Sequence, residues 1–264
     1  MATAEPTNAR IPVICAAPST VAGAEIFNPN SWSTDSKGIV HSCLAEFSVL
    51  HHCVGQIVAM CKEPERLCQP QIANLQQQWA AAKFDLGKMV LFGEQPDLHI
   101  RIEAFFAGVK SLLDLIVQLL SSEKIVAAAI HGFHRDQNVY GGSALKALRN
   151  NAPKDQKVLA GKIEALLAEH KDKWIDQVIC ARDQLVHPRR GMPQLMFQFE
   201  CEEKDGKLVC TQISPPAIGS TPIDQYAQRT LEQARSFASA FIALLQGSAV
   251  SNNGAQPTPA SGRG

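Results

Sequence analysis

Apolar residues recur at steps of three and four through much of the chain, which is the spacing of one face of an α-helix. Between residues 40 and 89 this pattern predicts two helices, separated by a gap at Pro64 and Pro70. A third helix is expected after Pro96, with Asp97 as its N-cap. The three apolar faces comprise Val40, Cys43, Phe47, Leu50, Val54, Ile57 and Cys61; Ile72, Leu75, Trp79, Leu86 and Met89; and Ile102, Phe105, Val109, Leu112, Ile116 and Leu119.

The helical pattern continues in the second half of the chain. Residues 131–153 are rich in glycine and predict a connector that carries one short helix over 143–150. A long helix is expected from near Pro153, with Trp174 on its core face. Since the residue before a proline avoids helical backbone, Pro188 should end this helix close to Val186. A last helix is expected over 223–245, returning to the others.

Residues 195–213 alternate between apolar and polar around Asp205-Gly206, which predicts a β-hairpin. In that register Cys201 and Cys210 lie directly opposite one another at a non-hydrogen-bonded position. A disulfide is geometrically possible there, and two reduced thiols are the favoured alternative in a cytoplasmic protein. Together these elements predict a mostly α fold: an antiparallel helical bundle with an inserted β-hairpin.

Both ends of the chain lack a periodic pattern. Residues 1–36 and 248–264 are rich in small and polar residues and proline, so we expect them to be disordered. Residues 37–247 then form a single helical domain. Of the 264 residues, 45% are hydrophobic, which is enough for a sizeable core.

The charge of the chain is balanced, with 25 basic and 25 acidic residues. This balance excludes a protein that coats nucleic acid through a global positive field, so any attraction to RNA must come from a local patch. The N-terminus does not resemble a signal peptide, and the longest apolar stretch, Leu112 to Ile130, is interrupted by four polar residues at 121–124. We therefore expect a cytoplasmic protein without a membrane span.

Soft metal ligands occur near one another in the first predicted helix, at His41, Cys43, His51, His52 and Cys53. The two cysteines of this set lie on the predicted core face, and no second group has the spacing of ligands. The eight cysteines of the chain form no CxxC pair, so most are expected to be reduced, buried residues. We therefore expect neither a metal site nor a cofactor.

Groups that can bind phosphate and move a proton gather where the long helix should end. Asp183 and His187 are four residues apart, so the carboxylate can reach and orient the imidazole. The helix C-terminus favours the charged ring and the neighbouring Arg189 and Arg190 oppose it, so His187 should exchange protons near neutral pH. Arg182 would hold the phosphate oxygens as charge builds on phosphorus. These groups suit metal-independent cleavage of RNA through its own 2′-hydroxyl.

One histidine does not easily serve both proton transfers of such a reaction. A two-fold homodimer that joins two copies of the motif in one composite site would supply both. Arg189 and Arg190 are candidate RNA phosphate-binding residues, with an ordinary solvated turn as the alternative. His131 and His134, in the glycine-rich connector, either border the active cleft or cap a turn.

The stretch RDQLVH, from Arg182 to His187, resembles the Arg-polar-x-x-x-His motif of the HEPN superfamily. The order of SALKALRNN, a spacer and a helix ending in WIDQVICARDQLVH is also similar, and the resemblance covers roughly residues 97–247. It implies a helical homodimer in which Arg182 and His187 form the catalytic pair at the interface and Asp183 is the polar neighbour. Many members are ribonucleases or toxins of toxin–antitoxin pairs, so RNA and an antitoxin protein are the expected partners.

A second class of function remains open on the same residues. The polar helix end is equally suited to a non-catalytic helical module of this fold that binds a ligand or a partner protein. A structural bundle with surface ion pairs at Arg182 and Asp183 is the third possibility. The chain contains no P-loop, dinucleotide fingerprint, GxSxG or HExxH motif, so the corresponding chemistries lack motif support.

Overall fold

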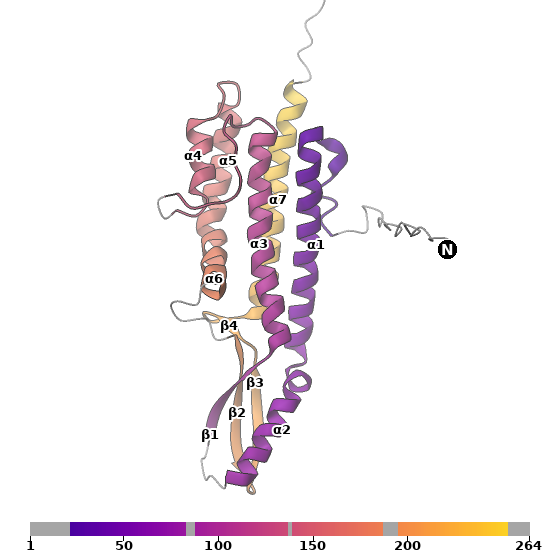
Figure 1. Cartoon of the computed structure of the whole chain (residues 1–264), viewed down its shortest axis with the longest axis vertical. Helices are drawn as coiled ribbons and strands as arrows, with labels where there is room; N and C mark the ends of the chain where they lie inside the picture. The colour runs from indigo at the N-terminus through magenta and orange to yellow at the C-terminus, as the bar shows by residue number, and fades with distance from the viewer. Residues whose placement is uncertain (1–21, 83–87, 137–138, 187–194, 253–264) are drawn as a thin grey trace, which may run out of the picture.

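The computed structural model of the chain describes residues 22–82, 88–136, 139–186 and 195–252. Figure 1 shows long helices running side by side, with a small sheet and one shorter helix at one end of the molecule. The fold is mostly helical, which confirms the predicted class at that level.

The bundle is built on α1 (Thr34–Lys62), α3 (Pro96–Ser122) and α7 (Ile223–Asn252). Helix α1 packs most extensively on α3 and also contacts α7. Every residue that the sequence placed on the first and third apolar faces is buried, so the helical spacing identified these core faces correctly. Helix α3 begins at Pro96 with Gln95 as its N-cap, so the predicted cap at Asp97 is wrong by two residues.

Helices α1 and α3 are also long and apolar enough to cross a membrane by length and composition. In the fold they lie against each other in the bundle, and 56% of the most apolar part of α3 is buried inside the molecule. A buried helix at the centre of a soluble bundle has the same composition. The cytoplasmic location read from the sequence stays a prediction.

The predicted long helix consists of three consecutive parts: α5 (Lys157–His170), a π-helical turn η3 (Lys171–Ile175) and α6 (Asp176–Val186). The expected short helix is α4 (Gly142–Asn150), which packs on α5, while α6 packs on α3. Trp174 is buried, as expected of a core residue. The π-helical turn was not predicted, because a single wide turn leaves the apolar spacing nearly unchanged.

Three antiparallel strands form a sheet in the order β1 (Lys88–Glu94), β2 (Met196–Lys204) and β3 (Lys207–Ser214). The hairpin at Asp205-Gly206 is confirmed, and both turn residues have positive φ, as this type of two-residue turn requires. Cys201 pairs with Cys210 across it, as predicted, and both are free thiols. A short two-stranded sheet, β4 (Ala217–Ile218) and β5 (Thr221–Pro222), leads into α7.

The second predicted helix is wrong at both ends. Helix α2 (Pro64–Ala82) runs through Pro70, where the sequence placed a gap. Pro70 lacks the N–H that would bond to the carbonyl of Arg66, and Arg66 lies at an exposed position of the helix. Met89, assigned to the helix, lies in β1 instead, and Leu86 lies outside the described residues. Strand β1 has apolar residues on both of its faces, so its sequence lacks the alternation of apolar and polar residues that predicts a strand. It is a strand because it pairs with β2, which is distant in the sequence.

The predicted disorder of residues 1–36 is wrong from Ala22 onward. Ile26, Phe27 and Trp32 are buried in the core, and the ring of Phe27 lies 6.1 Å from that of Phe47 on α1. A short 3₁₀ turn, η2 (Pro29–Ser31), precedes α1. Single large apolar residues in a polar segment carry no period, so only their packing reveals that the segment is ordered. At the other end, α7 continues to Asn252, past the boundary expected at 247.

Candidate functional site

The end of α6 meets the connector between α3 and α4 at a small charged cluster centred on Asp183. Arg182 donates from Nη1 to Oδ1 of Asp183 at 3.1 Å, and the Tyr140 hydroxyl donates to Oδ2 at 3.0 Å. Nη2 of Arg135 lies 3.9 Å from the same Oδ2. We call Arg135, Tyr140, Arg182 and Asp183 the Asp183 cluster.

The connector holds Arg135 and Tyr140 in place through a tight local turn. The backbone of Asp136 and Val139 exchanges two hydrogen bonds, of 3.1 and 2.9 Å, which bring both ends of this turn together. The guanidinium of Arg135 then lies over the Tyr140 ring, 3.9 Å from its centroid. Gly141 follows in the left-handed region, with φ of 66°, and turns the chain into α4.

The cluster carries two guanidinium groups against one carboxylate, so it keeps one net positive charge. The Arg182 and Asp183 side chains are 30% and 32% exposed, so the pair is partly shielded from water yet open to a ligand. Burial and the hydrogen bond to Asp183 raise the pKa of Tyr140, so its hydroxyl remains a donor at neutral pH. Nε of Arg182 is buried and has no hydrogen-bond partner within the described part of the chain.

A cavity of about 430 Å³ lies next to the cluster, and Arg135 belongs to both. His131 and His134 line this cavity together with Lys146 of α4, which pairs with Asp136 at 3.2 Å. The carbonyls of both histidines accept side-chain hydrogen bonds, from Gln118 and Ser143 respectively. Both histidines line a cavity, and a role at an active cleft stays a prediction. The remaining lining residues are Ala128, Ala129, Ile130, Gly132, Asp136, Ser143, Ala147, Asn150 and Asn151.

The structure brings together only part of the site predicted from the sequence. Arg182 and Asp183 are in contact, as their positions suggest. His187, Arg189 and Arg190 lie outside the described residues, so their distances from Arg182 stay predictions. The described contacts of the Asp183 carboxylate go to two arginines and a phenol, and its role as the orienter of His187 also stays a prediction.

Sequence reasoning missed Arg135 and Tyr140. They precede Asp183 by more than forty residues, in a connector without periodicity, and only the folding of that connector onto α6 places them there. The soft ligand types noted in α1 do not converge, because Cys43 and Cys53 face the core while His41, His51 and His52 are exposed. No group of three potential ligands occurs among the residues that the structure describes.

No protein-family model, curated protein or solved structure matches the chain. Membership of the HEPN superfamily therefore stays a proposal. Its support is the motif from Arg182 to His187, at the end of a long helix in a mostly helical fold.

Proposed function

We propose that this chain is a HEPN-like, metal-independent endoribonuclease that works as a homodimer. The observation that supports it most directly is the Asp183 cluster, where two guanidinium groups and a phenol meet at the end of α6. This arrangement lies at the helix end that carries the Arg-x4-His motif.

The cluster has the donors that a phosphodiester requires. Asp183 holds Arg182 through Nη1 and Nε is buried, so the remaining N–H groups at Nη1 and Nη2 are the ones proposed to bind phosphate oxygens. Arg135, stacked on Tyr140, would supply a second positive charge to the same phosphate. Because these groups are already held in position, they stabilise the charge that develops on phosphorus without reorganising during the reaction.

Proton transfer is assigned to His187. One copy would take the proton of the RNA 2′-hydroxyl as its oxygen attacks phosphorus, and the His187 of a second copy would protonate the departing 5′-oxygen. The products are a 2′,3′-cyclic phosphate and a free 5′-hydroxyl, and no metal is needed for this balance. A composite site of this kind requires a two-fold dimer that brings the ends of two α6 helices together.

The cavity beside the cluster offers a path for the RNA strand. Arg135 links it to the cluster, and Lys146, His131 and His134 add donors along its lining. Arg189 and Arg190 are proposed to bind flanking phosphates on the other side of His187. The remaining proposals are a cytoplasmic location, which follows from the pattern of the sequence, and regulation by an antitoxin protein, which follows from the family resemblance alone.

Cleavage of a mixed RNA substrate in EDTA by the purified chain tests the proposal. We expect Arg182→Ala to lower the rate about 100-fold or more, as removal of a preorganised donor to a transition state does. His187→Ala should lower it at least as much. Arg135→Ala, a substitution suggested only by the structure, should reduce the rate about tenfold. Arg235→Ala is the matched control, because this arginine pairs with Glu25 on an exposed surface of α7.

Two results would reject the enzyme. Wild-type protein that binds RNA without cutting it would favour the non-catalytic module of the same fold. Cleavage that persists in both Arg182→Ala and His187→Ala would assign the activity to other residues or to a contaminant. The dimer is tested separately, since a composite site predicts that activity per chain falls on dilution in parallel with the dimer fraction seen by sedimentation.

A further inference from the structure

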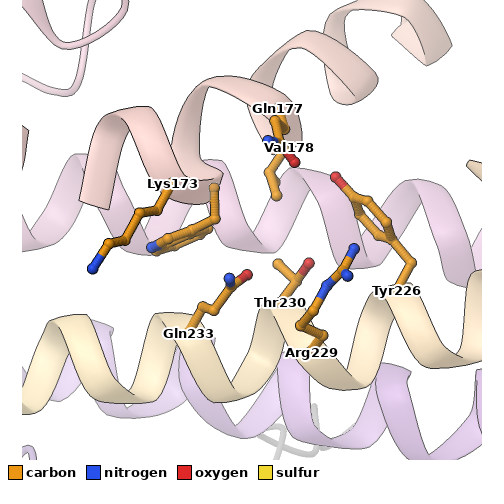
Figure 2. A pocket seen from close by; sticks show the side chains of 8 residues that line it. Lys173, Gln177, Val178, Tyr226, Arg229, Thr230 and Gln233 are labelled. Carbon is orange, nitrogen blue, oxygen red and sulfur yellow. The ribbon is translucent and has the colours of Figure 1, made fainter. Parts of the chain in front are cut away.

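A second pocket, separate from the Asp183 cluster, lies between α7 and the segment where η3 passes into α6. Figure 2 shows side chains of the two segments facing one another across it. Its volume is about 220 Å³. The lining consists of Lys173, Trp174, Gln177 and Val178 on one side and Tyr226, Arg229, Thr230 and Gln233 on the other.

The residues of this pocket are unusual for a contact between two helices. On α7 they stand at 226, 229, 230 and 233, which is the spacing that normally carries the apolar face of a packed helix. Three of these four positions are instead Arg229, Thr230 and Gln233, and Thr230 is buried. Arg229 is exposed and Gln233 is half-buried, so polar side chains line a space between the helices that solvent and a polar ligand can reach.

The charges of the pocket favour an anion. Lys173 and Arg229 line it, and no carboxylate is among its lining residues. Arg229 forms no ion pair within the part of the chain that the structure describes, and Figure 2 shows its guanidinium directed toward Tyr226, 5.8 Å from the ring centroid. Lys173 pairs with Glu169 at 2.7 Å, but both side chains are more than half exposed, so this pair is weak and can open for a ligand.

Two aromatic residues of the lining, Trp174 and Tyr226, are held in place or can donate a hydrogen bond without carrying a charge. Trp174 donates from Nε1 to Nδ1 of His170 at 2.9 Å, which fixes the indole within the wall. Burial raises the pKa of Tyr226 to about 12, so its hydroxyl stays protonated and can donate. The wall on this side is the π-helical turn η3, a rare element that is found preferentially at functional sites.

We propose that this pocket binds a phosphate group, with Arg229 as the principal cation and Lys173, Gln177 and Thr230 as supporting donors. Its volume is below the roughly 300–1,000 Å³ of pockets for drug-sized ligands, so it suits free phosphate or the phosphate end of a small molecule. None of its lining residues belongs to the Asp183 cluster. The inference therefore does not depend on the proposed ribonuclease activity.

Calorimetric titration of the full chain with inorganic phosphate, against sodium chloride at equal ionic strength, tests this site. We expect saturable binding by wild type that weakens at least about tenfold in Arg229→Gln. Arg235→Gln, at a position later in α7 and outside the pocket, should bind like wild type. The binding that Arg229→Gln removes should persist in Arg182→Ala with unchanged affinity, which separates this pocket from the Asp183 cluster.

A parallel titration with glycerol phosphate distinguishes the two possible ligands, free phosphate and the phosphate group of a small molecule. Tighter binding than inorganic phosphate would indicate a phosphorylated small molecule, and equal or weaker binding would indicate free phosphate; either supports the site. The proposal is overturned if wild type does not bind either probe, if folded Arg229→Gln binds as well as wild type, or if only Arg182→Ala loses binding. Circular dichroism and melting of each variant confirm that it is folded.

Discussion

Replacement of Gly141 by alanine tests how rigidly the connector holds Tyr140 on Asp183. Gly141 has φ of 66°, which costs an L-residue with a side chain roughly 1–2 kcal/mol. A Cβ atom there would also overlap the ring of Phe133, which is buried in the core. Forcing extra volume into a packed site typically costs about 1–3 kcal/mol. We therefore expect Gly141→Ala to lower the free energy of unfolding by about 2–5 kcal/mol in total.

Gly219 provides a matched control for the backbone part of this cost. Its φ is 60°, and a Cβ atom there would have no neighbour within 4 Å. Gly219→Ala should therefore cost only about 1–2 kcal/mol. Urea denaturation followed by circular dichroism measures both variants, and the difference between them isolates the overlap with Phe133. Equal losses of stability in the two variants would show that the Phe133 ring yields easily and that the connector is not rigid.

Three further predictions concern hydrogen bonding, acidity and thiol reactivity. Tyr140→Phe should lower the free energy of unfolding by about 1 kcal/mol, because it removes one partly exposed hydrogen bond to Asp183; an unchanged urea midpoint would show that the bond contributes nothing. Burial lowers the pKa of His170 below its ordinary value of 6.5. As the pH falls, the unfolded chain therefore binds a proton at this histidine before the folded chain does. The free energy of unfolding is therefore highest above pH 6.5 and decreases as the pH falls below it. The melting temperature of His170→Gln should fall less than that of wild type between pH 7.5 and 5.5, and equal falls would contradict this origin. Burial also raises the pKa of Cys43 to about 12, so iodoacetamide at pH 8 should modify the exposed Cys180 well before it modifies Cys43. Mass spectrometry of peptides measures both rates of modification. Equal rates at the two cysteines would mean that the core opens readily.

Local patterns in the sequence predicted the elements whose causes are local. The spacing of apolar residues identified α1, α3 and α7, since one face of a helix must be buried whatever packs on it. Asp205-Gly206 predicted the hairpin because a two-residue turn of this kind needs positive φ at both positions. Pro188 predicts a helix end close to Val186, because proline restricts the residue before it. Helix α6 is described as far as Val186 and residues 187–194 lie outside the described part of the chain, so this end stays a prediction.

Local patterns did not predict the elements whose structure depends on residues that are distant in the sequence. Strand β1 forms because β2, about a hundred residues later, pairs with it, and its own residues fit a helical stripe as well. Residues 22–36 are ordered because Phe27 and Trp32 are buried in the core. Two isolated apolar residues form no periodic pattern, so the sequence did not predict this packing.

The candidate site divides along the same line. Arg182 and Asp183 were identified from the sequence because they are adjacent, near the position where the long helix is expected to end. Arg135 and Tyr140 were not, since their contact with Asp183 exists only after the connector folds back on α6. The phosphate pocket at Arg229 likewise arises only where two helices meet. Sequence by itself determines helices, turns and chemically competent residues, because these depend on neighbours along the chain; tertiary structure decides which of those residues share a site, because that depends on contacts through space.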